Sequence, residues 1–386
     1  MTMQTTRIVI VGAGLSGLYA AYLLQRQGID DFVVLEARDD LGGRIASINA
    51  MGQAVSHASM DSSIDRFDLG PTWFWPSYQQ ELDQIVDALG LERFEQFEAG
   101  DMVVERSYEG SVVRMRGYVN SPPSMRLVGG MGMLVDALRR NVNPQRIATG
   151  QAVRRLRKHD SHVEVESHTA NGAVTTWRAE HVLLALPPRL LENTIDFEPV
   201  LPAELARQWK ATATWMAPHA KYIAIYDTPF WREQGLSGEA RSAGGPLGEI
   251  HDASMLGGSS ALFGFIGVPA SIRGQIPNET LRELCREQLA RMFGPVAAMP
   301  KAELIKDWAY DPYTATRADA NAVSQHAAAP SASASSGPWQ GCLTGIGSEW
   351  SPQFPGYLAG AVEAARLGVQ ALNARVAAST LSPLRS

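Results

Sequence analysis

The chain has 386 residues, of which 45% are hydrophobic and 19% are charged, with a formal net charge of −6. This composition is typical of a globular protein with a buried core and excludes a disordered chain. The negative balance gives no reason to expect nucleic acid or an anionic membrane surface as a partner. At this length, two domains are expected rather than one.

Cysteine content and hydropathy indicate where the protein is expected to work. Cys285 and Cys342 are far apart and lack the spacing of metal ligands, so we expect neither a disulfide framework nor a metal site. Few residues precede the first expected strand, which leaves no room for a secretion signal. No apolar run approaches the roughly 20 residues that span a bilayer. We therefore expect a soluble, cytoplasmic protein without a membrane partner. The sequence leaves the oligomeric state open, a homodimer being one option.

The first elements in chain order form a β-α-β unit. The β-branched run Ile8–Val11 predicts a buried strand, and the apolar residues Leu18–Leu24 predict a helix after a glycine-rich turn. Gln27-Gly28 ends this helix, and Phe32–Leu35 predicts a second buried strand. An aromatic segment follows at Gly70-Pro71-Thr72-Trp73-Phe74-Trp75-Pro76.

The rest of the chain alternates between short strands and helices. The expected helices cover residues 80–89, 133–140, 280–292 and 356–377, and a tight glycine turn at 129–132 precedes the second of them. Strands are expected at 102–104 and 112–113, and an antiparallel meander at 153–156, 163–165, 175–177 and 182–186. Residues 318–337 are rich in Ala, Ser and Pro and predict a surface loop.

The glycine turn after the first strand has the spacing of a dinucleotide-binding site. In Gly12-Ala13-Gly14-Leu15-Ser16-Gly17, the first glycine allows a tight turn, the second lets the backbone approach a pyrophosphate, and the third lets helix and strand pack closely. The diphosphate then lies at the positive end of the helix. Glu36 follows at the distance where a carboxylate accepts the ribose hydroxyls. Together these residues predict a bound dinucleotide.

A second glycine pair favours FAD over NAD as that dinucleotide. Leu41-Gly42-Gly43-Arg44 comes soon after the ribose acid, so it brings more backbone to the diphosphate, and Arg44 can neutralise a phosphate charge. The alternative for this segment alone is a surface loop that ends in a solvated arginine.

Several blocks together resemble the flavin-containing amine oxidase family, that is, monoamine, polyamine and L-amino acid oxidases. The blocks lie in the family's order and span most of the chain. They are Val9–Leu18, Leu35-Glu36-Ala37-Arg38 with Gly42-Gly43-Arg44, Asp68-Leu69-Gly70-Pro71, Gly129–Gly132, Lys221 with Pro229-Phe230-Trp231, Trp308, Gly347-Ser348-Glu349 and Gly356–Ala364.

The resemblance implies a mixed α/β (α+β) fold. A Rossmann-like FAD/NAD(P)-binding domain of the glutathione-reductase type would carry an inserted mixed-sheet substrate domain. Because glycine-rich elements lie at both ends of the chain, the FAD-binding domain is expected to be discontinuous, with residues 1–76, 129–192 and 306–386. Residues 77–128 and 193–305 are then the substrate-binding domain.

The resemblance also implies roles for individual residues. Glu36 is expected to hold the adenosine ribose, and the backbone of Val153 is expected to pair with the adenine. Trp308 is expected to pack against the flavin, while backbone amides of Tyr357 and Leu358 face its pyrimidine ring. The full expected cofactor-binding set is Gly12, Gly14, Leu15, Ser16, Gly17, Glu36, Ala37, Arg38, Gly43, Arg44, Gly70, Pro71, Thr72, Trp73, Val153, Trp308, Gly347, Glu349, Tyr357 and Leu358.

Lys221, Trp73 and Tyr357 are the expected catalytic residues. In a strand, Lys221 would share a face with Ile223 and Ile225, where an ammonium group needs hydrogen bonds. In the family, the corresponding lysine holds a water near flavin N5 and assists the reaction with oxygen. The alternative is an edge lysine whose charge reaches solvent.

Aromatic residues from two segments are expected to wall an apolar slot for the substrate. They are Trp73, Trp75, Phe354 and Tyr357. Such a slot would favour the neutral amine, the form that can release hydride to the flavin. For Trp75 the alternative is a plain core position.

Departures from the family pattern refine the expected site. Thr316-Arg317-Ala318 stands where monoamine oxidases carry the cysteine that joins flavin to protein, so FAD is expected to be non-covalent. The second aromatic of the family's paired cage aligns near Ala318, which leaves the cage half-built. Trp73 stands where L-amino acid oxidases place an arginine for the substrate carboxylate, which favours an amine over an amino acid.

The sequence therefore predicts an FAD-dependent oxidase of amines. It would move hydride from a C–N bond to flavin N5, form an imine and pass the electrons to O2 as hydrogen peroxide. Its expected partners are a small-molecule amine and O2. Two alternatives stay open: an FAD-dependent desaturase or protoporphyrinogen-oxidase-like enzyme acting on a large apolar substrate, and a flavin-binding protein without turnover.

Overall fold

The computed structural model describes residues 2–57, 63–107, 110–320 and 328–380. The chain divides into two compact units, one of residues 1–43, 134–215 and 324–386, the other of residues 44–133 and 216–323. These bounds differ from the predicted domain bounds, because residues 44–76 and 306–323 pack within the second unit and residues 193–215 within the first. Within the predicted surface loop at 318–337, residues 321–327 lie outside the described residues.

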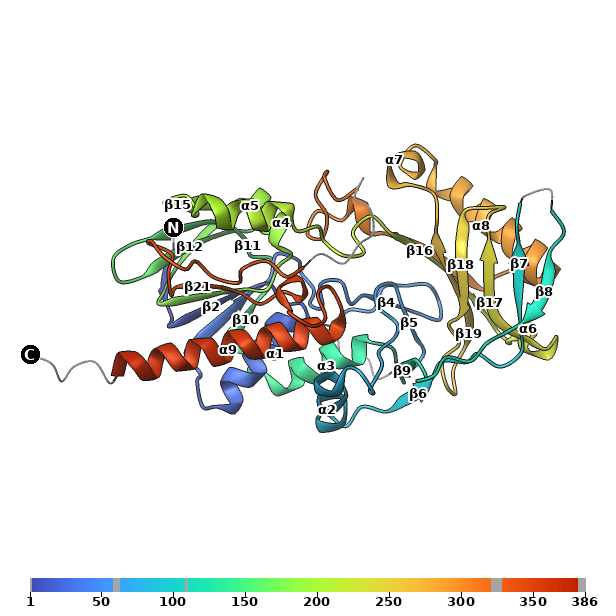
Figure 1. Ribbon diagram of the computed structural model, residues 1–386, viewed down its shortest axis with the longest axis horizontal. Coiled ribbons are helices and arrows are strands. Elements are labelled where there is room, and N and C mark those ends of the chain that lie inside the picture. The colour runs from blue at the N-terminus through green and yellow to red at the C-terminus, as the bar shows by residue number, and fades with distance from the viewer. Residues whose placement is uncertain (1, 58–62, 108–109, 321–327, 381–386) are drawn as a thin grey trace, which may run out of the picture. The chain divides into compact units, whose positions relative to one another are not determined.

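A parallel sheet forms the centre of the first unit (Figure 1). Its strands, in spatial order, are β10 (Ile147–Ala148), β3 (Phe32–Leu35), β2 (Ile8–Val11), β14 (His181–Leu184) and β21 (Leu343–Gly345). Every neighbouring pair is parallel. Helix α1 (Leu15–Arg26) joins β2 to β3 and packs against the last helix, α9 (Leu358–Thr380). The predicted β-α-β unit and its Rossmann-like fold are thus confirmed.

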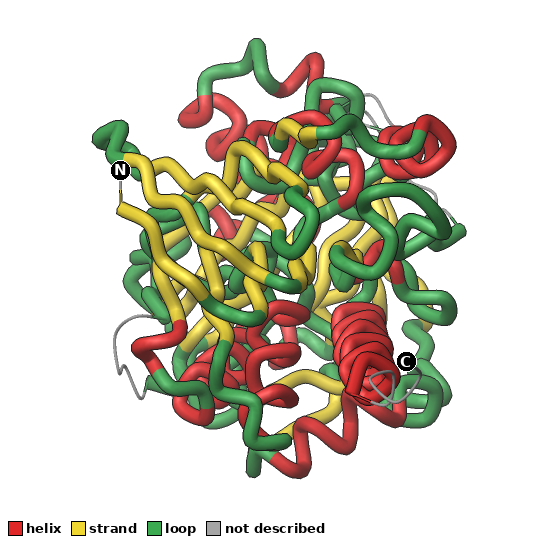
Figure 2. The backbone as a smooth tube through the Cα atoms, turned by 90° about the vertical axis from the view of Figure 1, so that its left-hand side faces the viewer, coloured by secondary structure: helices red, strands yellow, loops and turns green. Residues whose placement is uncertain are grey.

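A second sheet contributes to the hydrophobic core of this unit. Its strands are among those drawn in yellow in Figure 2. In spatial order it contains β1 (Thr2–Thr5), β13 (Val174–Ala179), β12 (Val163–His168), β11 (Ala152–Lys158) and β15 (Asp196–Glu198). Strands β11, β12 and β13 are antiparallel, as the meander predicts. Strand β12 buries Val163 and Val165 and turns Glu164 away from the core.

Two predictions for this unit are wrong. Residues 182–186 were expected to extend the meander, but β14 lies in the parallel sheet between β2 and β21. The reason is that Val182, Leu183 and Leu184 are all buried, which suits a strand covered on both faces. No strand is predicted for the polar residues before Ile8, yet β1 pairs in parallel with β13.

A seven-stranded sheet forms the second unit. In spatial order it contains β20 (Ala302–Asp307), β16 (Ala220–Tyr226), β19 (Ser260–Ile266), β18 (Leu247–Asp252), β17 (Leu236–Ser242), β7 (Asp101–Glu105) and β8 (Val113–Arg116). Neighbouring strands are antiparallel except β17 and β7, which are parallel.

The two faces of this sheet meet different elements. Tyr222 and Ala224 of β16 share a core with helix α8 (Asn278–Phe293). Ile223 and Ile225, on the opposite face, pack with the hairpin of β4 (Ser47–Asn49) and β5 (Arg66–Asp68). Because side chains alternate along a strand, Lys221 belongs to the face that meets β5.

The remaining elements connect these layers. They are α2 (Gln80–Ala88), β6 (Arg93–Glu95), β9 (Met125–Leu127), α3 (Gly132–Asn141), α4 (Pro188–Thr194), α5 (Ala203–Ala211), α6 (Phe230–Glu233) and α7 (Ala270–Arg273). The helices predicted at 80–89, 133–140 and 280–292 are found as α2, α3 and α8. In the described part of the chain, no helix is both long and apolar enough to cross a membrane.

Candidate functional site

The glycine turn lies at the carboxyl ends of the parallel strands, the edge at which open α/β sheets bind ligands. Gly12 follows β2 with φ of +102°, and a Cβ there would lie 2.9 Å from the carbonyl oxygen of Ala185, just past β14. A Cβ on Gly347, past β21, would lie 2.7 Å from the carbonyl oxygen of Leu186. A Cβ on Gly17 would overlap the carbonyl of Gly12. Three strand ends therefore meet here, at distances that only glycine permits.

The start of helix α1 is open to an anion. Gly14 is its N-cap, no side chain caps the helix, and its first turn has no acidic residue. The second glycine pair lies against the same turn, because the Gly42 amide donates to the Ala13 carbonyl at 2.9 Å. Gly43 has φ of +60°, and its Cβ position lies 3.4 Å from the Cα of Gly14. Backbone amides and a helix dipole thus converge where a diphosphate is expected.

Glu36 has a structural task that the sequence does not reveal. Its carboxylate accepts hydrogen bonds from the backbone amides of Ala13 at 2.7 Å and Arg38 at 2.9 Å. It therefore ties the end of β3 to the glycine turn. Each carboxylate oxygen keeps a second lone pair for a ribose hydroxyl. The Gln151 amide donates to the Glu36 carbonyl at 2.7 Å, which brings the start of β11, and Val153 with it, to the same place.

These observations fit the ADP half of FAD. A Cβ on Gly12 or Gly17 would clash within the turn, the helix start is uncapped, and a buried acid stands at the end of the next strand. The residues expected to hold the diphosphate and the ribose are Gly12, Gly14, Leu15, Ser16, Gly17, Glu36, Ala37, Arg38 and Gly43, all in the first unit.

The closing segment of the first unit supplies the other expected cofactor residues. Glu349 is buried in a short 3-10 turn, Ser348–Trp350. Tyr357 is 37% exposed, but its amide donates to the carbonyl of Phe354 at 3.1 Å. Because that amide is already bonded within the chain, the predicted contact with the flavin pyrimidine is left to Leu358, the first residue of α9.

Lys221 is buried in the second unit and bonded to the segment Gly70–Thr72. Its side chain is 2% exposed. Its Nζ donates to Thr72 Oγ1 at 2.6 Å and to the Gly70 carbonyl at 3.1 Å, and it lies 4.0 Å from the centre of the Phe263 ring. The alternative of an edge lysine whose charge reaches solvent is therefore excluded.

The segment from Leu69 to Thr72 is fixed from several sides. Trp308 Nε1 donates to the Leu69 carbonyl at 3.1 Å. A Cβ on Gly70 would overlap the backbone carbonyl of Arg44 and lie 3.6 Å from the Trp308 ring. The second unit thus brings together Gly70, Pro71, Thr72, Lys221 and Trp308, which the family resemblance places near the flavin ring, and Arg44, which it places near the diphosphate.

Asp68 and Arg126 form a buried charged cluster with Lys221 that sequence reasoning missed. Burial raises the pKa of Asp68, an effect that Lys221 and Arg126 oppose. Burial lowers the pKa of Lys221 to about 7, and Asp68 opposes this shift. Two features of the sequence could have indicated this cluster: Asp68 stands shortly before the Gly70-Pro71 pair, and Arg126 stands between the apolar residues of β9.

A cavity of about 160 Å³ lies beside Trp73 in the second unit. Its lining includes the aromatic residues Trp73, Trp75, Phe97, Tyr118 and His251 and the charged residues Glu98, Glu239, Arg241, Glu249 and Asp252. Trp73 and Trp75, two of the residues predicted to wall an apolar slot, line this cavity together with four carboxylates. Phe354 and Tyr357 belong to the first unit and do not line this cavity.

The aromatic wall of the cavity is held by side-chain hydrogen bonds. Trp73 Nε1 donates to Gln96 Oε1 at 2.8 Å, and Trp75 Nε1 donates to Ser124 Oγ at 3.0 Å. The Trp73 ring packs on Phe263, with centroids 5.3 Å apart, and Phe263 is also the ring beneath Lys221. One ring therefore connects the cavity wall to the buried lysine.

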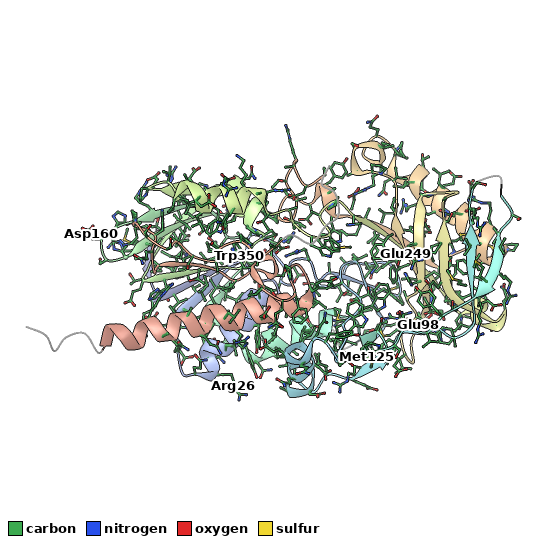
Figure 3. All side chains as sticks on the ribbon, in the orientation of Figure 1. Arg26, Glu98, Met125, Asp160, Glu249 and Trp350 are labelled. Carbon is green, nitrogen blue, oxygen red and sulfur yellow. The ribbon has the colours of Figure 1, made fainter. Side chains whose placement is uncertain are left out.

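The charges around the cavity do not cancel. Arg241 pairs with both Glu239 and Glu249, and Asp252 accepts from Arg232 Nε at 2.8 Å. Glu98 accepts from the Asn120 amide at 2.6 Å, and no cation pairs with it among the described residues. His251 Nε2 also lies 2.6 Å from Glu249 Oε1. Four carboxylates thus face two arginines and one histidine, so the lining keeps an excess of negative charge. Figure 3 labels Glu98 and Glu249.

Comparisons with known proteins place this arrangement in a family. Residues 105–373 match the family model described as flavin containing amine oxidoreductase, and residues 10–89 match an NAD(P)-binding Rossmann-like domain. A Dictyostelium discoideum protein described as probable flavin-containing monoamine oxidase A is 24% identical, over 80% of this chain and 84% of its own. Putrescine oxidase from Kocuria rosea is 24% identical, over 80% of this chain and 83% of its own.

Solved structures show the same fold. A putrescine oxidase bound to putrescine has a TM-score of 0.74 at 20% identity and covers 97% of this chain and 100% of its own. Cyclohexylamine oxidase from Brevibacterium oxydans has a TM-score of 0.76 at 18% identity and covers 96% of this chain and 99% of its own. From the family match over most of its length, this chain belongs to the flavin-containing amine oxidoreductases, which are FAD-dependent enzymes.

Proposed function

We propose that this protein is an FAD-dependent oxidase of amines. When bound, FAD would supply the acceptor for a hydride from the carbon beside the amine nitrogen, which would leave an imine, and the route by which two electrons reach O2 as hydrogen peroxide. The observation that carries the proposal is the buried Lys221, bonded to the Gly70 carbonyl and the Thr72 hydroxyl. A buried ammonium is unfavourable unless it has such partners, so its retention beside this segment points to a functional task.

The task proposed for Lys221 is to hold and move a proton at Nζ. With its pKa lowered to about 7 by burial, the group can exist in either protonation state near neutral pH. Asp68 favours the charged form, and Thr72 and Gly70 fix the position of the nitrogen. Lys221 is then suited to position a water and to compensate charge that forms during the reaction with oxygen.

The acidic cavity supports a narrower substrate class, namely amines that carry a second positive charge. Four carboxylates line the cavity, and an ammonium that enters it would meet both negative charge and aromatic faces. A substrate carboxylate would instead have to displace Glu239 or Glu249 from Arg241. The cavity therefore favours a diamine over an amino acid. It also disfavours a large apolar substrate, because carboxylates that lose water without gaining a partner are costly.

A titration of the purified, FAD-loaded protein tests the proposed activity. Under anaerobic conditions, 1,4-diaminobutane and 1-aminobutane should each bleach the visible absorbance of the bound flavin. Admission of air should restore the colour and release one equivalent of hydrogen peroxide. Persistence of the oxidised spectrum with a broad panel of amines would leave the alternative of a flavin-binding protein without turnover.

Charge-neutral variants of the cavity test the substrate class. Glu98→Gln and Glu239→Gln should each raise the KM for 1,4-diaminobutane by roughly 10- to 100-fold, the loss expected for a hydrogen bond to a charged group. The KM for 1-aminobutane should change little. Glu283→Gln, at an exposed position on α8, is the matched control and should leave both values unchanged. Equal effects on the two amines would contradict the assignment of the cavity.

A further inference from the structure

Two histidines and a glutamate meet at the tip of the hairpin formed by β11 and β12. His159 and His162 flank the two-residue turn Asp160-Ser161, and the His159 amide donates to the His162 carbonyl at 2.9 Å. The two histidines therefore face each other directly across the hairpin. Glu164 follows His162 by two residues, so it lies on the same face of the sheet, away from the buried Val163. Figure 3 labels Asp160 at this tip.

The side chains of these three residues converge. His159 Nε2 lies 3.2 Å from Glu164 Oε2, and His162 Nε2 lies 3.8 Å from Glu164 Oε1. The two imidazole rings stack with centroids 4.7 Å apart and planes 13° apart. One ligand atom from each residue lies within 4.8 Å of the others. The arrangement follows from the hairpin register, so little further ordering is needed to assemble it.

The Nε2 atoms of His159 and His162 are buried without a hydrogen-bond partner among the described residues. Both Nε2 atoms are shielded from solvent, and within the described residues neither makes a well-directed hydrogen bond. Ser161 Oγ lies 3.4 Å from His162 Nδ1 and can accept its proton, which leaves a lone pair on Nε2. A lone pair that points at a carboxylate is unfavourable unless a proton or a metal ion lies between them.

We propose that His159, His162 and Glu164 form a binding site for a divalent transition metal of the kind that prefers imidazole, with Zn²⁺ as its probe. Two histidine nitrogens and one carboxylate oxygen form a known type of zinc-ligand set. With bonds of about 2.0–2.2 Å in a tetrahedral arrangement, neighbouring ligand atoms lie about 3.3–3.6 Å apart. The observed separations of 3.2 Å to Glu164 Oε2 and 3.8 Å to Glu164 Oε1 lie close to that range, and the three ligand atoms, all within 4.8 Å of one another, would have to draw closer around a metal ion.

Two arginines weaken this site and provide a directional test. Arg157 lies 3.7 Å from Glu164, but its main partner is Glu198, to which its Nε donates at 2.7 Å. Arg178 Nε lies 3.5 Å from Glu164 and its side chain is 45% exposed, so it can move into solvent when a cation binds. Removing the Arg178 charge should therefore tighten metal binding.

Calorimetric titration of ZnCl2 into tag-free, FAD-loaded protein tests the proposal after dialysis against EDTA. One Zn²⁺ per chain is expected. His159→Gln and His162→Gln should each weaken binding by at least about 10- to 100-fold, since even outer-shell partners of a metal contribute that much. Arg178→Gln should strengthen it. The matched control is His168→Gln on β12, the strand that carries Glu164. His168 pairs with Glu166 at 2.8 Å and is not one of the three proposed ligands, so this substitution should leave zinc affinity unchanged.

Two results would overturn the metal site. One is a wild-type titration that cannot be distinguished from that of the double variant H159Q/H162Q. The other is a loss in His168→Gln as large as that in His159→Gln. Melting temperature and flavin absorbance, measured without metal, should be the same for all variants, since the hairpin tip is exposed and lies in no step of the proposed reaction.

Discussion

Lys221 is held away from water, and its pKa in the folded protein is about 7, below its ordinary value of 10.5. Between these two pH values the unfolded chain keeps the proton and the folded chain has lost it. Raising the pH through this window therefore favours the folded state, and the unfavourable contribution of Lys221 is largest below pH 7. Burial of Lys221 therefore lowers the stability of the fold near neutral pH, and it also gives the side chain a pKa near 7.

Lys221→Met should change the pH dependence of stability. Relative to wild type, the urea midpoint of the variant should fall as the pH rises from 7 to 9.5, because only the wild type gains from loss of the Lys221 proton. Asp68 adds to this trend. Burial raises its pKa and Lys221 opposes that shift, so in the variant the pKa of Asp68 should rise further and its ionisation should destabilise the fold at higher pH.

Lys301→Met supplies the control for this measurement, because Lys301 is an exposed partner of Asp227. Its midpoint relative to wild type should not depend on pH in the same window. A pH-independent difference between Lys221→Met and wild type would show that the lysine titrates normally.

Side-chain partners from distant strands were the part of the site that the sequence could not reveal. The alternation of side chains along β16 is a local property of the sequence, so it could be predicted that Lys221 shares a face of the strand with Ile223 and Ile225. Its neighbours Asp68 and Arg126 come from β5 and β9, which no local pattern connects to β16. The carboxylates around Trp73 were missed for the same reason, since they are gathered from strands β17 and β18 and the segment after β6.

At the scale of elements, two glycines at the start of α1 have separable tasks. A Cβ on Gly17 would overlap the Gly12 carbonyl, so Gly17→Ala should distort the turn and lower the stability of the flavin-free protein. A Cβ on Gly14 would be 3.8 Å from the Gly42 carbonyl oxygen, which is ordinary contact, and Gly14 already has φ of −72°. Gly14→Ala should therefore fold normally but block the backbone approach of the diphosphate.

Urea unfolding of the flavin-free proteins and a titration with FAD separate these effects. The Gly14→Ala midpoint should match that of wild type, while its FAD affinity should fall by at least about tenfold, equal to about 1.4 kcal/mol. The Gly17→Ala midpoint should be lower. If Gly14→Ala binds FAD as tightly as the wild type does, the diphosphate does not lie against Gly14 and the prediction is wrong.

Helices were easier to predict than strand partners. Apolar spacing located α2, α3 and α8 to within a few residues, because a helix satisfies its own backbone. Strand β14 was recognised as a strand but assigned to the wrong sheet, and β1 was missed, because its pairing with β13 uses backbone groups that any sequence carries. The predicted domain bounds differ from those of the structure for a related reason, because tertiary contacts and not local composition decide with which unit residues 44–76 pack.

For the whole molecule, we predict that FAD leaves the protein on denaturation. The chain has two cysteines, both are buried, and burial raises the pKa of both thiols, which makes them poor nucleophiles towards the flavin. Precipitation with acid should leave the yellow colour in the supernatant. Flavin fluorescence that stays with the unfolded polypeptide on a denaturing gel would contradict this prediction.

The position of β21 and α9 at the end of the chain has a consequence for biosynthesis. Strand β21 completes the parallel sheet beside β14, and α9 packs against α1, yet both are translated long after β2 and α1. At about 5–20 residues per second, the roughly 330 residues between β2 and β21 take about 15–70 s to translate. Throughout that interval the sheet edge stays unpaired and α1 stays uncovered by α9, so chaperones can engage the nascent polypeptide before its FAD-binding unit is complete.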